Sequence, residues 1–145
     1  MLNTIMNDMK LAMKAKDSLR LNAIRMFRAA LKDKEIELKT NLTDTDVIAI
    51  ASRLIKQRKD AATQYLAANR QDLADKELAE VDVLAVYLPK QMHEQAVTEA
   101  VAQAIAKTGA TAMKDMGKVM AVLKPSLQGK TDMSLVSKQV KAALT

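Results

Sequence analysis

The sequence of 145 residues contains no cysteine, no tryptophan, one histidine, three glycines and only three aromatic residues. Without cysteine it cannot form a disulfide, a thiol nucleophile or a cysteine-ligated zinc site, and one histidine cannot build a histidine cluster for a metal. The glycines fit neither of the common phosphate-binding loop patterns, GxGxxG and GxxxxGK[ST]. Phe27, Tyr65 and Tyr87 are too few to form the stacking surfaces that read single-stranded RNA. These absences disfavour a self-sufficient enzyme, and we expect neither a metal nor a cofactor.

The charge is basic and unevenly distributed. Lysine and arginine number 23 against 17 acidic residues, which gives a net charge of +6. Residues 1–88 hold 15 basic and 13 acidic side chains, whereas residues 89–145 hold 8 basic and 4 acidic ones. Such an excess favours polyanions, namely RNA, DNA or acidic lipid headgroups, although a basic surface that serves only solubility explains the same numbers.

The N-terminus and the hydropathy pattern predict a soluble cytoplasmic protein. The first eight residues lack the basic segment and the apolar run of a signal peptide. No apolar stretch approaches the roughly 20 residues that span a bilayer. We therefore expect no membrane association.

Apolar residues at helical spacing predict four helices before Pro89. The second ends near Thr40. The third opens on a capping box, because Thr43 can cap and Asp46 stands three residues later. We expect the fourth helix to stop at Pro89.

Three shorter helices are predicted after Pro89. Gly109 closes the first as a C′ residue, Pro125 ends the second, and Thr131 or Asp132 caps the third. No strand-like alternation is present. The sequence therefore predicts an all-α protein, with an N-terminal four-helix bundle over residues 1–89 and a small three-helix domain over residues 90–145.

Two charged residues interrupt the apolar stripes of their helices. Arg58 lies between Leu54 and Tyr65 at helical spacing, and Glu77 lies between Leu73 and Val81. Because an unpaired buried charge costs several kcal/mol, we expect Arg58 and Glu77 to pair across the third and fourth helices. The alternative is a carboxylate tuned for acid–base chemistry, but no second catalytic group accompanies it.

The basic residues form two candidate nucleic-acid surfaces. Arg25, Arg28 and Lys32 share a side of the second helix. The second surface consists of lysines after Pro89. Two of them, Lys118 and Lys130, directly follow a glycine, which lets backbone N–H groups approach a phosphate. Solvated lysines on short helices are the plain alternative. The C-terminal candidates are Lys114, Gly117, Lys118, Lys124, Gly129, Lys130, Lys138 and Lys141.

The ten methionines lie mostly on helical stripes, where they are typical core residues. Met113, Met116, Met120 and Met133 provide an alternative, a methionine-rich face that docks a partner protein. His93 stands where a cap residue would open the fifth helix, and we interpret it as a solvated linker residue rather than a base or metal ligand.

Several segments together resemble one family, the YqeY-like proteins. They are Leu54-Ile55-Lys56-Gln57-Arg58-Lys59-Asp60-Ala61, Asn69-Arg70-Gln71-Asp72-Leu73, Tyr87-Leu88-Pro89-Lys90-Gln91, Asp115-Met116-Gly117-Lys118-Val119-Met120 and Gly129-Lys130-Thr131-Asp132. Two positions depart from the family pattern. Met133-Ser134 stands where a further glycine is usual, and His93 replaces the usual serine cap.

The resemblance implies a stand-alone relative of the C-terminal helical and tail region of the B subunit of tRNA-dependent aspartyl/glutamyl amidotransferase. It implies a two-part helical fold and a partner among tRNA, the amidotransferase and other translation components. It also implies the family label of a carbon–nitrogen ligase with glutamine as amide donor. The chain lacks the kinase-like cradle and any amidase Ser/Lys arrangement, so that activity cannot reside in it alone.

Three hypotheses follow. The first is a non-catalytic module that binds the tRNA body through phosphate contacts of the C-terminal lysines, with Arg25, Arg28 and Lys32 as a secondary surface. The second is a protein-interaction adaptor that uses the methionine-rich C-terminal face without RNA. The third is an autonomous amidotransferase. The sequence leaves the identity of the tRNA and the oligomeric state open.

Overall fold

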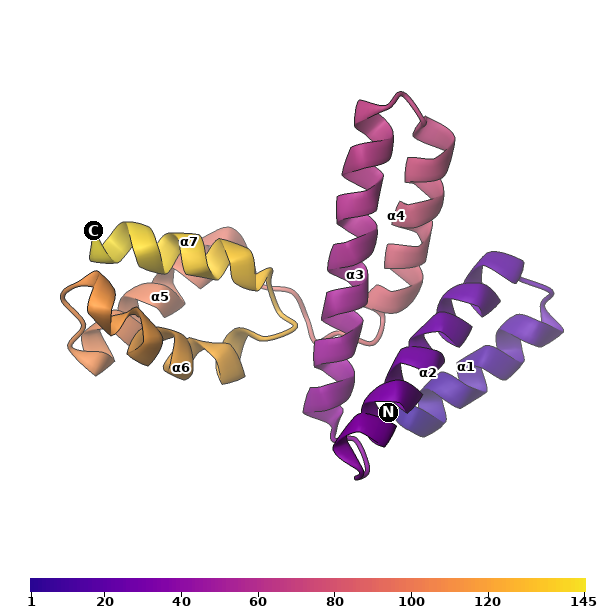
Figure 1. The fold of residues 1–145 in the computed structure, drawn as a ribbon, viewed down its shortest axis with the longest axis horizontal. Coiled ribbons are helices and arrows are strands. Elements are labelled where there is room, and N and C mark those ends of the chain that lie inside the picture. Colours follow the sequence, from indigo (N-terminus) through magenta and orange to yellow (C-terminus); the bar gives the residue numbers. More distant parts are fainter. The chain divides into compact units, whose positions relative to one another are not determined.

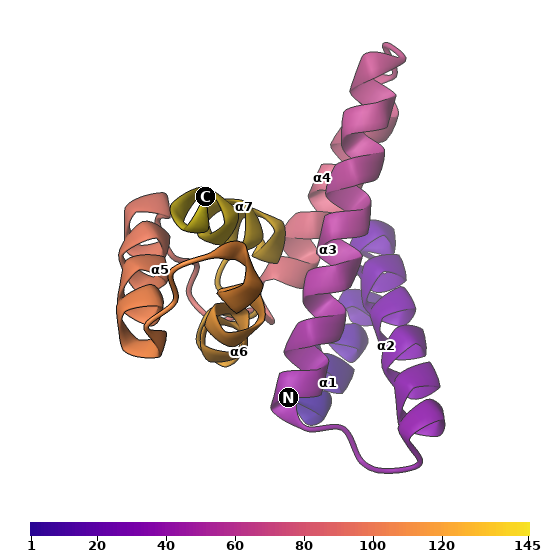
Figure 2. The ribbon, with the colours of Figure 1, turned by 60° about the vertical axis from the view of Figure 1, so that its left-hand side comes forward.

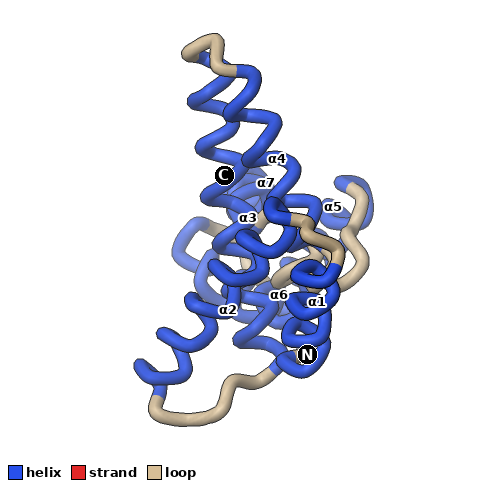
Figure 3. Tube along the Cα trace, turned by 90° about the vertical axis from the view of Figure 1, so that its right-hand side faces the viewer, coloured by secondary structure: helices blue, strands red, loops and turns tan.

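The computed structural model describes residues 1–145 and confirms the all-α class. It contains seven α-helices, one short 3₁₀ helix and no strand (Figure 3). The chain divides into two compact units, Met1–Leu88 and Pro89–Thr145. No helix is long and apolar enough to cross a membrane. The helices are α1 (Leu2–Lys14), α2 (Ser18–Leu38), α3 (Asp44–Ala67), α4 (Gln71–Ala85), α5 (Glu94–Thr108), α6 (Met116–Leu127) and α7 (Met133–Leu144), with the 3₁₀ helix η1 at Met113–Asp115.

The N-terminal unit consists of two helical hairpins. Helices α1 and α2 form one, α3 and α4 form the other, and α2 packs against both α3 and α4 (Figure 1). The loop end of the α3–α4 hairpin extends beyond the α1–α2 hairpin, as Figure 1 shows. The core gathers buried side chains from all four helices, among them Ile5, Phe27, Leu54 and Leu84.

The start of α3 confirms the predicted capping box. The Thr43 Oγ1 accepts a hydrogen bond from the Asp46 N–H at 3.2 Å, and the Asp46 carboxylate accepts one from the Thr43 N–H at 3.0 Å. The bond from the Thr43 N–H, and then one from the Thr43 hydroxyl to the same carboxylate at 3.0 Å, hold the pKa of Asp46 below its usual value. Local chemistry alone fixes this helix start after the α2–α3 loop, which is visible in Figure 2.

The expectation that α4 continues to Pro89 is wrong, because the helix ends at Ala85. The turn that follows places Tyr87 in the core, with its ring 5.4 Å from that of Phe27. The Tyr87 hydroxyl donates to the Asp8 carboxylate at 2.7 Å. Burial, and then this hydrogen bond, raise the pKa of Tyr87 well above its ordinary value. Because α4 ends early, Tyr87 makes both a ring contact with Phe27 of α2 and a hydrogen bond to Asp8 of α1.

The C-terminal unit packs α5, α6 and α7 around aliphatic side chains such as Val101, Val119 and Val140. Gly109 closes α5 at φ +68°, as predicted, in the left-handed region that glycine enters without strain. The Asp132 carboxylate caps α7 by accepting from the Ser134 N–H at 2.8 Å.

Pro125 does not end α6, contrary to expectation, and the helix continues to Leu127. Proline removes one hydrogen bond near the helix end. Leu123 and Leu127 lie one turn apart and are both buried, and the Gln128 N–H still reaches the Lys124 carbonyl at 3.0 Å. Burial of Leu127 outweighs the missing bond.

Candidate nucleic-acid interface

Six lysines gather on the second half of the C-terminal unit, against only two acidic residues, Asp115 and Asp132. Helix α5, by contrast, carries Glu94 and Glu99 against Lys107. Five of the six lysines are exposed, Lys130 is half-buried, and none has a carboxylate within 4.0 Å. The six are Lys114, Lys118, Lys124, Lys130, Lys138 and Lys141. Their charge is therefore available to a polyanion.

The exposed face of α6 is lined by small side chains. Gly117, Ala121 and Pro125 follow one another at intervals of four and are all exposed. Lys118 directly follows Gly117 and Lys124 directly precedes Pro125, so on a helical wheel the two lysines border this line on opposite sides. Space is open where a side chain on Gly117 would stand. A phosphate backbone can therefore approach α6 closely between two cations.

Asp115 stands at the N-terminus of α6 and moderates the positive charge there. Its carboxylate accepts from the Thr111 N–H at 3.1 Å and makes no capping bond to α6. This backbone hydrogen bond holds the pKa of Asp115 below its usual value, and the charges of Lys118 and Lys114 lower it further. The carboxylate thus stays ionised beside two lysines.

The loop between α6 and α7 uses its glycine for its own turn. Gly129 is buried, has φ +82°, and its carbonyl accepts from the Gln91 Nε2 at 2.6 Å. The Lys130 carbonyl accepts from the Met92 N–H at 2.8 Å. The loop therefore holds the segment before α5 in place, and of the two glycines predicted to face a phosphate only Gly117 is exposed.

The remaining predicted cations lie on α7 and, in the other unit, on α2. Lys138 and Lys141 are exposed one turn apart on α7. On α2, Arg25 and Lys32 are exposed, whereas Arg28 is half-buried and donates from Nη1 to the Met9 sulfur at 3.2 Å. The α2 cations adjoin an apolar surface, which distinguishes them from the lysines of α6 and α7.

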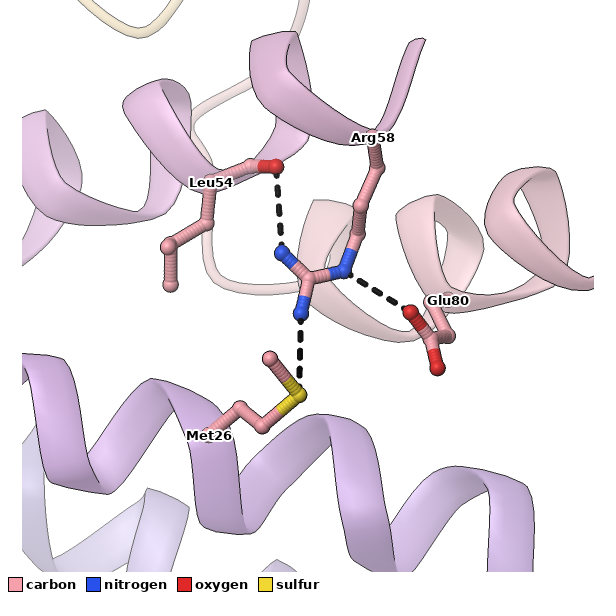
Figure 4. A network of polar contacts seen from close by, with 4 residues as sticks. All are labelled: Met26, Leu54, Arg58 and Glu80. Atoms are coloured by element: carbon pink, nitrogen blue, oxygen red, sulfur yellow. Dashed lines mark hydrogen bonds and ion pairs between the residues drawn. The ribbon is translucent and has the colours of Figure 1, made fainter. Parts of the chain in front are cut away.

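The predicted pairing of Arg58 with Glu77 is wrong, because Arg58 pairs with Glu80. The Arg58 Nε donates to the Glu80 carboxylate at 3.0 Å, as Figure 4 shows. Its Nη1 donates to the Leu54 carbonyl at 3.2 Å, and its Nη2 to the Met26 sulfur at 3.5 Å. Arg58 and Glu80 are buried, while Glu77 is only half-buried. The pair joins α3 to α4, and its role is structural.

The Glu80 partner follows from the position of the hairpin turn. Asn69 adopts φ +59° in the tight turn between α3 and α4. Arg58 and Glu80 lie eleven residues before and after Asn69, so an antiparallel hairpin centred there places them opposite each other. Glu77 lies nearer the turn. The correct partner could therefore have been found in the sequence by counting residues outward from Asn69 in both directions.

Comparison with known protein families assigns the chain to one of them. The YqeY-like protein model matches residues 2–144, nearly the whole chain. The chain belongs to the YqeY-like family. The match spans both units.

Three curated relatives of this YqeY-like protein carry the name altered inheritance of mitochondria protein 41, mitochondrial. The one from Vanderwaltozyma polyspora is 44% identical over 82 residues, which are 56% of this chain and 44% of the relative. Those from Saccharomyces cerevisiae and Lachancea thermotolerans are 43% and 39% identical over 82 residues. The match thus spans less than half the length of these relatives. Their names place those proteins in mitochondria, and the cytoplasmic location of this chain stays a prediction.

The C-terminal methionines mostly serve the core. Met116, Met120 and Met133 are half-buried and pack against the C-terminal cluster, and only Met113 is exposed. His93 is the N-cap of α5 and makes no side-chain capping bond. No group of three or more histidine, aspartate or glutamate residues could hold a metal ion.

Proposed function

We propose that this YqeY-like protein is an RNA-binding accessory module whose C-terminal unit contacts the phosphate backbone of tRNA. One observation carries the proposal: Lys118 and Lys124 border an exposed line of small residues on α6, and neither has a carboxylate within 4.0 Å. Phosphate contacts supply affinity and orientation without reading bases, which suits a unit that contains no aromatic residue.

The choice of tRNA among polyanions is supported by the resemblance to the tail region of the amidotransferase B subunit. In this proposal the protein assists tRNA-dependent amidation by holding the tRNA and does not itself form the amide. The family label of a carbon–nitrogen ligase then describes the reaction that the protein serves. Lys114, Lys130, Lys138 and Lys141 add longer-range attraction around the α6 contact.

A binding titration against total tRNA and duplex DNA at several salt concentrations tests the proposal. The test variant is Lys118→Gln with Lys124→Gln. The matched control is Lys90→Gln with Lys107→Gln, which removes two exposed charges from the same unit outside α6. Because each lost phosphate contact removes about 0.7–0.9 from the slope of log K against log salt, the test variant should lose roughly 1.5 from that slope. The control should keep most of it.

Equal slopes in the two double variants would show that the attraction is diffuse and would contradict the α6 contact. Absence of tRNA binding by the intact chain at low salt would contradict the proposal as a whole. Tighter binding of duplex DNA than of tRNA would contradict the choice of tRNA. Amide formation from glutamine by the purified chain would overturn the accessory assignment.

A further inference from the structure

An apolar stripe on α1 lies directly beside the core-facing side of the helix. Ile5 and Ala12 are the buried residues of this helix. Leu2, Met6 and Met13 keep 44%, 41% and 49% of their surface exposed, and Met9 is half-buried. The intervals of four, three and four place all four stripe residues on one side of the helix. In this stripe of Leu2, Met6, Met9 and Met13, Met9 packs against the edge of the core, and the other three side chains are exposed.

Cations of α2 line one edge of the stripe. The Arg28 Nη1 reaches the Met9 sulfur at 3.2 Å, which fixes this side of α2 against α1. A thioether is a weak acceptor, so the guanidinium keeps most of its donor capacity. Arg25 and Lys32 are exposed on the same side, and none of the three has a carboxylate within 4.0 Å.

The opposite edge of the stripe is basic as well. Lys10 follows Met6 by one turn and Lys14 follows Met13 directly, and both are exposed. On a helical wheel they lie beyond the stripe on the side away from Ile5 and Ala12. The apolar stripe thus lies between two cationic borders.

The surface is hollowed between α1 and α2. A cavity of about 230 Å³ opens there, with Arg28, Lys32 and Glu35 on its polar side. This volume is below the roughly 300–1,000 Å³ of sites for drug-sized molecules, so it suits a protruding side chain better than a cofactor. Its apolar walls come from Leu2, Ile5, Met6 and Leu31.

We propose that the groove between α1 and α2 receives an amphipathic helix of a partner protein that bears acidic residues beside its apolar face. Apolar side chains of that helix, spaced three and four residues apart, lie along the methionine stripe, and one enters the cavity. Flanking carboxylates pair with Arg25 and Lys32 on one side and with Lys10 and Lys14 on the other. Flexible methionines adapt their shape to such partners.

Charge and shape together favour a helix over other anionic partners. An RNA backbone would use the cations but would leave Leu2 and Met6 uncovered. A lipid surface would need the apolar residues to protrude, whereas the cavity recedes between the helices. The proposal uses only the N-terminal unit and is independent of tRNA binding by α6.

The test follows carbon-13-labelled methionine methyl groups of the full chain by NMR. Five methionines lie in each unit, so those of the C-terminal unit are internal controls. The probe is a synthetic helical peptide with leucines at heptad spacing and flanking glutamates; its control carries lysines at the glutamate positions. The glutamate peptide should shift the signals of Met6, Met9 and Met13 saturably, and the lysine peptide should bind at least about tenfold more weakly.

Charge reversal on the protein provides the second arm. Arg25→Glu with Lys32→Glu should weaken the glutamate peptide by at least about tenfold and reverse the preference between the peptides. Arg53→Glu with Lys59→Glu changes the same charge at exposed positions of α3 and should retain the preference. Both variants replace exposed residues, and an unchanged midpoint of tyrosine fluorescence in urea shows that the N-terminal unit folds in each.

Four outcomes would overturn the proposal. They are no shift with either peptide, equal shifts with both, shifts confined to the C-terminal methionines, and equal losses in the two protein variants. Anionic phospholipid vesicles and tRNA are added in parallel. If either perturbs Met6, Met9 and Met13 saturably while the glutamate peptide does not, the groove serves that class instead and the proposal fails.

Discussion

In the N-terminal unit, charged and aromatic side chains join separate helices. The Arg58–Glu80 pair connects α3 with α4, and Tyr87 connects the end of α4 with α1 and α2 through Asp8 and Phe27. In the C-terminal unit, the buried cluster that joins α5, α6 and α7 contains only valine, alanine and leucine. Its lysines lie outside that cluster, without ion pairs.

This difference separates residues that hold the fold from residues that are available to partners. A charged residue buried between helices is tied to its neighbour, so its replacement should appear as lost stability. An exposed lysine without a carboxylate neighbour should change binding and leave stability nearly unaltered. Within the N-terminal unit, the α1–α2 hairpin resembles the C-terminal unit in this respect, because Arg25 and Lys32 are exposed and unpaired.

Glu80→Ala should have the largest effect on stability. It leaves Arg58 buried without its carboxylate, which costs about 3–5 kcal/mol. All aromatic residues lie in the N-terminal unit, so tyrosine fluorescence in a urea titration of the full chain follows this unit alone. Its midpoint should fall strongly.

Glu77→Ala is the matched control for that prediction. Glu77 is half-buried three residues away on α4 and forms no ion pair, so its loss should change the free energy of unfolding by less than about 1 kcal/mol. Replacing the pair together, by Arg58→Met and Glu80→Leu, should restore much of the stability lost in Glu80→Ala. Similar losses in Glu77→Ala and Glu80→Ala would contradict the assignment of the pair.

The two glutamates also show how far a sequence can be taken. Helical periodicity identified Arg58 and Glu77 as exceptions on apolar stripes, and the cost of burying an unpaired charge predicted that Arg58 would pair with a carboxylate. The choice between Glu77 and Glu80 depended on the register of the hairpin, which Asn69 sets through its left-handed backbone. By contrast, the Thr43–Asp46 box lies within four residues and could be predicted completely.

Tyr87→Phe should have a smaller effect and a distinctive pH dependence. Losing the hydrogen bond to Asp8 should cost about 1 kcal/mol near neutral pH while the contact with Phe27 is kept. The folded state raises the pKa of Tyr87, so it favours the protonated phenol. This stabilisation is complete below the unfolded pKa of about 10 and is lost as the pH rises above it.

The measurement compares intact chain and Tyr87→Phe by urea unfolding, followed by circular dichroism, from neutral pH to strongly alkaline pH. Lysine titration affects both proteins, so the difference between them isolates Tyr87. That difference should shrink steadily above pH 10 or so. A difference independent of pH would show that the phenol proton plays no part in stability.

The lysine surface was predictable only as a set of candidates. Composition located the charge after Pro89, and the glycines preceding Lys118 and Lys130 looked equivalent in the sequence. Long-range contacts distinguish them, because the Gly129 carbonyl binds the side chain of Gln91, 38 residues away. Gly117 lies within a helix and makes no such contact, so whether it is exposed depends on which face of α6 packs against the core.

The smallest effects concern two glycines of the C-terminal unit and should have opposite signs. Gly109→Ala places a side chain at φ +68°, where open space gives no clash but the backbone itself is strained, at a cost of about 1 kcal/mol. Gly117→Ala lies in α6 at an ordinary helical φ and also in open space, so it should stabilise by roughly 0.5–1 kcal/mol. The C-terminal methionine methyl signals follow this unit in urea, and the tyrosine signal should stay unchanged in both variants.

The added methyl group of Gly117→Ala also narrows the approach to α6, so tRNA affinity should fall while stability rises. If affinity rises together with stability, phosphate does not lie on this face between Lys118 and Lys124.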